Sequence, residues 1–270
     1  MSDFRYKLGF IGSGNMAEAI ARGAIEQGVL KPEQMMASDP TPTRRDAFEA
    51  FGVNCVDDSA GVIAKAEQIV LAVKPQILPK LGEALGGLDL EKQVVVSIMA
   101  GIASDKIESA LGGPARVVRV MPNTPLMVGH GMSAVALGPH AKPGDDALIL
   151  EVLGACGEAI RVDESQMDAV TAVSGSGPAY LFLLAEAMRQ AAEGLGVGEH
   201  ADVLVNQTLL GASTLLKTSP DGPAELRAKV TSPGGTTQAA IECFQKLGFE
   251  PLVRDAMTAA RDRSVDLGKT

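Results

Sequence analysis

Short apolar runs alternate with amphipathic segments along the chain as far as Val162. The apolar runs end in glycine, proline or small polar residues, which is typical of buried parallel strands. We expect strands at 7–11, 35–38, 68–73, 93–98, 116–121, 132–137 and 158–162. Helices are predicted from 15 to about 27 and at 60–66, 105–111 and 145–153. This alternation predicts an α/β fold, a doubly wound and mostly parallel sheet of the Rossmann type with helices on both faces.

From Glu164 onward the pattern changes, and only helical segments are predicted. The segment 178–193 is apolar on all sides in its first two turns, and 203–216 has no charged residue in 14 positions. Such helices must be buried on every face. Because a tail of this length cannot easily enclose both, we expect a second subunit to cover them. The predicted domains are therefore 1–163, which binds a dinucleotide, and 164–270, an all-helical domain for substrate binding and dimerisation.

A glycine-rich turn, Gly12-Ser13-Gly14, separates the first predicted strand from the first predicted helix. Gly12 allows a tight turn out of the strand. Gly14 lacks a Cβ, so a pyrophosphate can approach the backbone where the helix N-terminus presents free N–H groups. Because the pattern follows a strand and opens a helix, it predicts a dinucleotide site. An ordinary strand-to-helix turn is the alternative.

The residues at the end of the second predicted strand are compatible with either NADH or NADPH. Asp39 lies where this kind of fold places the residue that meets the adenosine ribose, and its carboxylate would favour a free 2′-hydroxyl over a 2′-phosphate. Ser38, Thr41, Arg44 and Arg45 stand beside it and could neutralise a phosphate. The arginines could equally belong to a solvated helix face.

Two other turns have candidate chemistry. Lys74 follows a buried strand, at the edge of the sheet where doubly wound folds bind ligands. The alternative is that its side chain extends into solvent without binding a ligand. In the tail, Thr231-Ser232-Pro233-Gly234-Gly235-Thr236-Thr237 precedes an amphipathic helix at 238–247. Backbone N–H groups of Gly235, Thr236 and Thr237 would form an anion site of carboxylate size. A capped helix without a ligand is the alternative.

Composition narrows the possible partners. The net charge is −9, and the 24 lysines and arginines are scattered, which argues against nucleic acid and anionic membranes. The three cysteines lack a CxxC pattern, so we expect them in the core, with neither a disulfide framework nor a metal site. The first residues are charged and no apolar run approaches the roughly 20 residues of a membrane span. We therefore expect a cytoplasmic protein.

With these residues in view, the chain resembles the Δ1-pyrroline-5-carboxylate reductase family over essentially its whole length. The resemblance rests on five motifs, of which the last two are the most specific: Gly12-Ser13-Gly14-Asn15-Met16, Ala72-Val73-Lys74-Pro75-Gln76, Arg119-Val120-Met121-Pro122-Asn123-Thr124-Pro125, Ser174-Gly175-Ser176-Gly177-Pro178-Ala179-Tyr180 and Thr231-Ser232-Pro233-Gly234-Gly235-Thr236-Thr237. It implies reduction of pyrroline-5-carboxylate to L-proline, the last step of proline synthesis, with an NADPH cofactor. It also implies a homodimer through the C-terminal helices that often assembles further.

The resemblance also implies roles for individual residues. The cofactor pyrophosphate would meet Gly14, Asn15 and Met16, and its nicotinamide side would meet Val73, Lys74, Pro75 and Ala100. Ser59 occupies a position near the ribose where members of the family often carry Asn. Asp39 occupies a position where members of the family usually carry Asn or Ser. Asp39 therefore leaves NADH open as an alternative to NADPH.

On the substrate side, the resemblance implies that the Thr237 hydroxyl meets the ring nitrogen and that the backbone of Gly235 and Thr236 holds the carboxylate, with Glu164 also involved. A threonine is no strong acid, so we expect Thr237 to position the ring and relay a proton. One alternative is a β-hydroxyacid dehydrogenase, but Leu181 stands where those enzymes carry a catalytic lysine. A catalytically silent NAD(P)-binding protein is the other.

Overall fold

The computed structural model describes residues 4–79, 81 and 85–269. Its strands are β1 (Tyr6–Ile11), β2 (Met35–Ser38), β3 (Asn54–Val56), β4 (Ala66–Leu71), β5 (Val94–Ser97), β6 (Arg116–Met121), β7 (Gly131–Leu137) and β8 (Gly157–Arg161). The helices between them are α1 (Asn15–Glu26), α2 (Pro42–Glu49), α3 (Ser59–Ile63), α5 (Ser104–Leu111) and α6 (Ala147–Ala155). Short helical turns are η1 (Pro32–Gln34), η2 (Pro75–Ile77) and η3 (Thr124–Val128).

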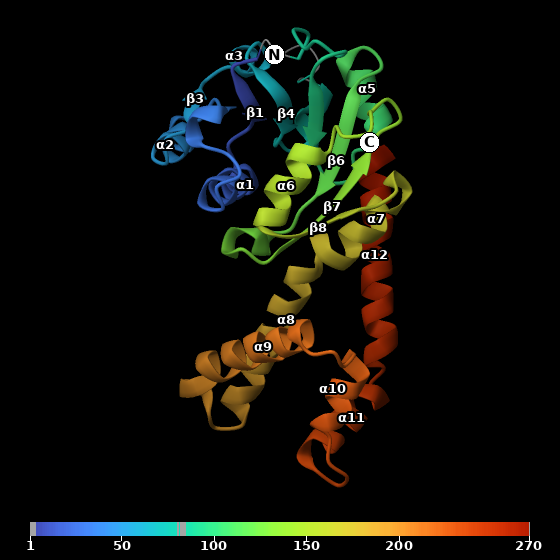
Figure 1. Cartoon of the computed structure of the whole chain (residues 1–270). Coiled ribbons are helices and arrows are strands. Elements are labelled where there is room, and N and C mark those ends of the chain that lie inside the picture. Colours follow the sequence, from blue (N-terminus) through green and yellow to red (C-terminus); the bar gives the residue numbers. More distant parts are fainter. Residues whose placement is uncertain (1–3, 80, 82–84, 270) are drawn as a thin grey trace. The chain divides into compact units, whose positions relative to one another are not determined.

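The second half of the described chain is helical throughout. It comprises η4 (Glu164–Gln166), α7 (Met167–Val170), the π-helical turn η5 (Thr171–Gly175), α8 (Gly177–Gly194), η6 (Gly198–His200), α9 (Ala201–Thr218), α10 (Pro223–Lys229), α11 (Thr236–Lys246) and α12 (Phe249–Lys269). Figure 1 labels the α-helices of this half, α7 to α12. The prediction that strands stop before Glu164 is confirmed for the described residues.

All eight strands form one sheet in the order β3-β2-β1-β4-β5-β6-β7-β8. Pairing is parallel from β3 to β6, β7 runs antiparallel to β6, and β8 is parallel to β7. The order reverses at β1, which pairs with β2 on one side and with β4 on the other. Ligands of open α/β sheets bind at the carboxyl ends of the strands beside such a reversal.

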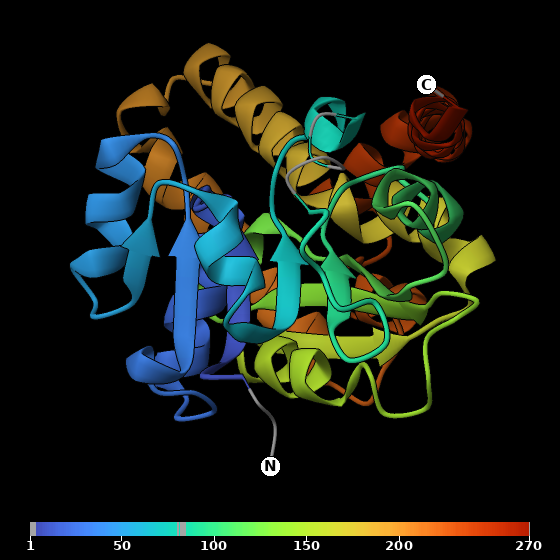
Figure 2. The same cartoon turned by 90° about the horizontal axis from the view of Figure 1, so that it is seen from above.

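Helices cover both faces of the sheet, as Figure 2 shows. Leu8 and Phe10 of β1 point into one apolar cluster that includes Ile20 of α1. Ile11 points to the opposite face, into a cluster that includes Ile107 of α5. Full burial of one such side chain stabilises the fold by about 1.5–3 kcal/mol. The predicted α/β class with a Rossmann-type sheet is confirmed.

The seven predicted strands are present, with small differences in their bounds. β6 spans the predicted residues, but β4 ends at Leu71 rather than at residue 73. The Ala72 N–H still bonds to the Ile11 carbonyl at 2.9 Å, after which the chain turns away. β3 and α2 were not predicted. An edge strand of three residues, Asn54–Val56, is too short to show a periodicity.

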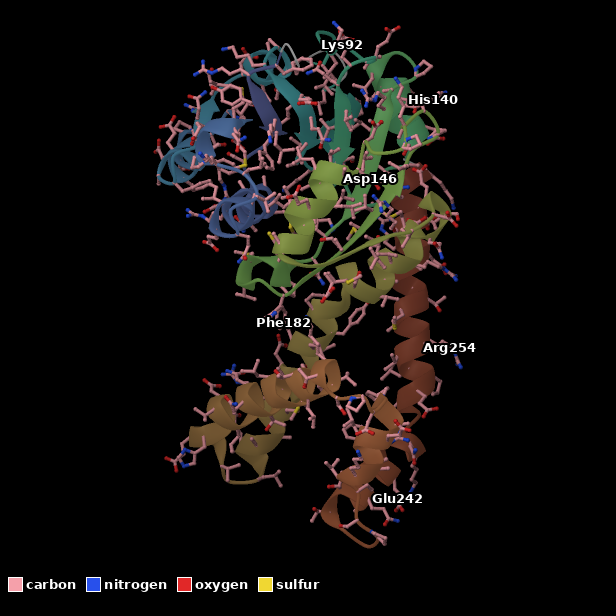
Figure 3. The ribbon with its side chains drawn as sticks, viewed as in Figure 1. Lys92, His140, Asp146, Phe182, Glu242 and Arg254 are labelled. Atoms are coloured by element: carbon pink, nitrogen blue, oxygen red, sulfur yellow. The ribbon has the colours of Figure 1, made fainter. Side chains whose placement is uncertain are left out.

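The chain divides into two compact units. One comprises the described residues up to Ser176 together with 260–269, and the other comprises 177–259. In the second unit, α8 has no buried residue, and Phe182, labelled in Figure 3, is 63% exposed. Val203 of α9 is 74% exposed. These helices therefore leave apolar faces uncovered within one chain.

Two of the three cysteines lie in the core. Cys55 and Cys156 are buried, whereas Cys243 on α11 is exposed. The expectation of core packing was therefore wrong for Cys243 in the single chain, because α11 has no buried residue. Burial, followed by the negative charges of Asp39 and Glu49, raises the pKa of the Cys55 thiol to about 11.

Candidate functional site

The glycine turn lies between β1 and α1, at the reversal point of the sheet. Gly12 has φ +95°, and a Cβ there would lie 2.7 Å from the Ala72 carbonyl oxygen. Only glycine combines this conformation with so close an approach. Gly14 is the N-cap of α1, and no side chain caps the helix there. A Cβ on Gly14 would meet nothing within 4 Å, so this side of the turn has room for a ligand.

The Asp39 carboxylate holds the glycine turn from the end of β2. Its Oδ2 accepts a hydrogen bond from the Ser13 N–H at 3.0 Å, and its Oδ1 accepts one from the Thr41 N–H at 2.9 Å. Partial burial raises the pKa of Asp39, but these hydrogen bonds outweigh it, so the pKa lies below the ordinary 3.8. Ser38 is buried, and its hydroxyl donates to the Phe10 carbonyl at 3.4 Å. The ionised Asp39 carboxylate thus stabilises the glycine turn through these hydrogen bonds.

Two arginines from α2 reach toward the same edge. Arg44 Nη1 donates to Asn15 Oδ1 at 2.7 Å, which ties α2 to the start of α1. Arg45 Nη1 donates to the carbonyl oxygens of Asp39 and Pro40 at 2.8 and 3.0 Å. Both arginines lie on α2. The Arg45 guanidinium lies beside the main chain at Asp39 and Pro40, and the Arg44 guanidinium lies beside Asn15.

A hollow of about 390 Å³ opens beside the glycine turn within the first unit. It is lined by Gly14–Ala17, Ala72–Lys74, Ile98, Met121–Thr124 and Gly175. These residues follow the carboxyl ends of β1, β4, β5 and β6 or belong to η5. Four of the five motifs that the sequence singled out therefore contribute to one hollow. Of the predicted cofactor contacts, Gly14, Asn15, Met16, Val73 and Lys74 are in its lining. Outside it are Gly12, Ser13, Ser38, Asp39, Ser59, Pro75 and Ala100, of which Ser59 begins α3.

The arrangement fits the phosphates and the nicotinamide of a dinucleotide. The N-terminus of α1 presents backbone N–H groups and the positive end of a helix dipole to the open side of Gly14. Ser13 Oγ is buried without a hydrogen-bond partner among the described residues. No group of three or more His, Cys, Asp or Glu side chains in the described part of the chain could hold a metal ion.

Asn123 is a site residue to which the sequence analysis gave no role. It is 7% exposed, and its Nδ2 donates to the Ser174 carbonyl at 3.0 Å, while its Oδ1 accepts from the Met132 N–H at 2.9 Å. It therefore ties the end of β6 to η5 and β7. A polar residue between prolines, directly after a buried strand, is the signal that could have identified it. Gly175 packs beside it, and a Cβ there would displace the end of the Met121 side chain.

Glu164, predicted to bind substrate, is held by protein donors. Its Oε1 accepts from the Ser104 N–H at 2.7 Å, the Ser104 hydroxyl at 2.8 Å and Arg119 Nη1 at 3.0 Å. Burial raises the pKa of Glu164, but the Ser104 hydrogen bonds and Arg119 outweigh it and lower the pKa below 4.5. Glu164 thus satisfies the N-terminus of α5 and neutralises a buried arginine of β6.

The second predicted anion turn lies in the other unit, at the N-terminus of α11. Gly235 is the N-cap with no side-chain cap, so Thr236 and Thr237 occupy the first turn. The turn is shaped by short-range bonds, from the Gly235 N–H to the Ser232 carbonyl at 3.0 Å and from the Gly234 N–H to Gln238 Oε1 at 2.7 Å. Thr236 is exposed and Thr237 is half-buried. The turn presents N–H groups and a hydroxyl on one short segment.

Comparison with known proteins covers both units. Residues 164–267 match a family model for pyrroline-5-carboxylate reductase dimerisation, and residues 7–101 match one for NADP oxidoreductase, coenzyme F420-dependent. A pyrroline-5-carboxylate reductase from Pseudomonas aeruginosa is 44% identical over 266 residues, which are 97% of each chain. None of the helices in the described residues has the length and apolar character needed to cross a membrane.

Solved structures of the same kind are similar along nearly the whole chain. A pyrroline-5-carboxylate reductase from Coxiella burnetii has a TM-score of 0.90 at 36% identity, with 98% of this chain and 100% of that chain covered. A pyrroline carboxylate reductase from Plasmodium falciparum, with NADP bound, has a TM-score of 0.86 at 29% identity, with 98% and 99% covered.

Proposed function

The chain belongs to the pyrroline-5-carboxylate reductase family, and we propose that it reduces Δ1-pyrroline-5-carboxylate to L-proline with NAD(P)H, the last step of proline biosynthesis. The observation that carries the proposal is that four family motifs line one hollow at the reversal point of the sheet. The fifth forms an uncapped helix N-terminus with Thr237 in its first turn.

The bound nicotinamide supplies the hydride that the ring C=N carbon accepts. We propose that Gly14, Asn15 and Met16 at the start of α1 bind the cofactor pyrophosphate, since Gly14 has open space beside an uncapped helix N-terminus. Gly12 and Ser13 shape the turn instead, because their N–H groups donate to the Ser38 carbonyl and the Asp39 carboxylate. The turns at Val73–Pro75 and Ala100 would position the nicotinamide side. Because an iminium is already electrophilic, the protein needs only to hold the ring and assist protonation of its nitrogen.

For the substrate, we propose that the Thr236 N–H at the start of α11 binds the carboxylate and that the Thr237 hydroxyl positions the ring nitrogen and relays a proton. Gly235 serves as the N-cap that shapes the turn, because its own N–H already donates to the Ser232 carbonyl. The exposed, locally shaped turn supports this role. Glu164 would serve the substrate site indirectly, because its Oε1 already accepts hydrogen bonds from Ser104 and Arg119.

We propose NADPH as the preferred cofactor, with NADH as the alternative that Asp39 keeps open. Arg45, which donates to the Asp39 carbonyl, and Arg44, which donates to Asn15 at the start of α1, support NADPH. Steady-state kinetics with both cofactors would test the preference. Arg44→Ala should lower kcat/KM with NADPH about tenfold and leave NADH nearly unchanged, because a charge-assisted contact to a phosphate is worth about 1.5–3 kcal/mol. Equal effects on both cofactors would contradict this assignment.

The exposed apolar faces of α8 and α9 support a homodimer formed by the C-terminal helices, with a higher oligomer as a further possibility. We propose residues 1–163 and 164–270 as the functional domains and the cytoplasm as the compartment. Light scattering coupled to gel filtration tests the dimer, and a monomer at micromolar concentration would contradict it.

The activity is tested by following absorbance at the NAD(P)H band. Oxidation of the cofactor with pyrroline-5-carboxylate supports the reductase. Activity with β-hydroxyacids alone would instead indicate a dehydrogenase, although Leu181 offers no base. Cofactor binding without turnover of either substrate would indicate a catalytically silent NAD(P)-binding protein.

A further inference from the structure

The last turns of α12 are anchored in the first compact unit, although the helix begins in the second. Figures 1 and 2 both show this end of α12 beside α5. Ser264 is the buried residue of α12, with 3% exposure. Its hydroxyl donates to Asp168 Oδ1 of α7 at 2.6 Å, a short bond to a carboxylate. One polar contact therefore fixes the rotation of these turns against the first unit.

The same turns meet the loop between β5 and α5 through backbone atoms. Gly101 has φ +75°, and a Cβ there would lie 2.9 Å from the Ser264 carbonyl oxygen and 3.0 Å from Leu267 Cβ. Reciprocally, a Cβ on Gly268 would lie 2.6 Å from the Gly101 carbonyl oxygen. The helix and the loop can approach this closely only because a glycine stands on each side.

Leu267 extends the contact to a second turn. It shares the lining of a hollow of about 700 Å³ with Pro75 and Gln76, which follow β4, and with Ile102, which follows β5. The end of α12 therefore borders both turns to which the proposed function assigns the nicotinamide side of the cofactor. Ala100 lies between the buried Met99 and Gly101, so its position depends on how Gly101 is held.

We propose that the last turns of α12 position the Ala100–Gly101 turn for the nicotinamide end of the cofactor, with Ser264 and Gly268 as positioning residues. The proposal rests on the reductase function, from which the role of Ala100 comes. A displacement of this turn by a fraction of an ångström would alter the distance over which hydride crosses, and such changes are costly in rate. No atom of α12 needs to touch the cofactor for this effect.

Gly268→Ala tests the contact directly, because the added methyl group must push the Gly101 carbonyl away. We expect the Kd for NADPH, measured by fluorescence titration, to rise about tenfold through overpacking. Gly154→Ala is the matched control: Gly154 is an exposed helical glycine of α6 whose Cβ would meet nothing within 4 Å. The control should bind NADPH as the wild type does.

Ser264→Ala removes only a hydroxyl and should raise the NADPH Kd several-fold, as should Asp168→Ala. Asp168→Asn should bind like the wild type, because its amide oxygen still accepts the hydrogen bond. Hydrogen exchange of residues 98–103 provides a readout besides activity. It should quicken in Gly268→Ala and Ser264→Ala but not in Gly154→Ala.

The outcomes separate this proposal from the reductase function. A wild-type protein that does not reduce pyrroline-5-carboxylate would overturn the function. A wild-type reductase whose Gly268→Ala and Ser264→Ala variants keep the NADPH Kd and the exchange of 98–103 would overturn only the role of α12. Lower melting temperatures with an unchanged Kd would likewise assign these residues to stability alone.

Discussion

The turn at Gly12–Ala17 and the turn at Ser232–Thr237 are built on the same plan and held in different ways. Each opens a helix, each has a glycine N-cap, and neither has a side-chain cap. Both therefore present N–H groups to an anion. Around the first turn, Ser13 is fully buried and Ala17 is 1% exposed. Around the second, Ser232, Pro233 and Gly234 are exposed.

Their hydrogen bonds differ accordingly. The first turn is held by residues distant in sequence, since the Ser13 N–H bonds to Asp39, 26 residues away. The bonds found for the second, to Ser232 and Gln238, span three or four residues. One turn is thus fixed by the core of the first unit, and the other by bonds within its own short segment. Mutations at the core-held positions of the first turn should disturb folding and binding together, and mutations in the second should leave folding intact.

Gly12→Val should have the largest effect. A β-branched residue at φ +95° is strained by about 1–3 kcal/mol, and its Cβ would overlap the Ala72 carbonyl oxygen. We expect a lower melting temperature and no measurable NADPH binding. Gly14→Ala is the control, because it has room for a Cβ and ordinary φ: it should fold normally while binding NADPH more weakly. Equal stability losses in both variants would break the comparison.

Thr237→Ala should have the second-largest effect. The loss of one hydroxyl should lower kcat about 100-fold, in the range of a lost proton-transfer group. The NADPH Kd and the melting temperature should stay unchanged, because the turn is shaped by local backbone bonds. Thr237→Ser should retain most of the activity, and Thr236→Ala should stay near wild type, since its proposed contact is a backbone N–H. Equal losses of turnover and NADPH affinity in Thr237→Ala would count against the role.

Glu164→Gln tests whether the Glu164 carboxylate stabilises the fold, as the Asp39 carboxylate does at the first turn, or binds the substrate. The folded-state pKa is lowered, so the stabilisation by the carboxylate is present above about pH 4.5 and is lost as pH falls through the folded value. At pH 7 we expect the variant to lose about 1–3 kcal/mol of unfolding free energy, because Arg119 loses its charged partner. Urea unfolding at several pH values measures this.

The difference between wild type and Glu164→Gln should shrink as the solution is acidified below about pH 4. Glu151→Gln, which changes an exposed carboxylate on α6, is the control and should leave stability unchanged. A variant with wild-type stability but a raised KM for pyrroline-5-carboxylate would place Glu164 on the substrate side after all.

Thiol labelling compares the two regions without changing the sequence, and we expect it to have the smallest effect on the protein. Cys55 is buried in the core, and its raised pKa of about 11 leaves it almost wholly protonated at pH 8. Cys243 lies exposed on α11, the helix that follows the second turn. With a chromogenic disulfide, Cys243 should react at once and Cys55 and Cys156 only on unfolding. If Cys243 is also slow, a partner covers α11 in solution.

Much of the first unit could be predicted because its signals are local. A strand buried on both faces appears as an unbroken apolar run, and β6 was predicted at its observed bounds for this reason. The turn at Gly12–Gly14 was identified because a tight turn and a close anion approach both demand glycine. β3 and α2 were not predicted, because an edge strand of three residues and a largely polar helix show little hydrophobic periodicity.

The sequence by itself determined the fold class, the family and the position of the two glycine turns that open α1 and α11. Tertiary structure decided which side chains hold them: Asp39 on Ser13, Asn123 on Ser174 and Glu164 on Ser104 join residues 26, 51 and 60 positions apart. It also brought Gly268 against Gly101. Local patterns record which conformations a segment favours, but the partner of a polar group depends on strand order and helix packing, which only the folded chain brings about.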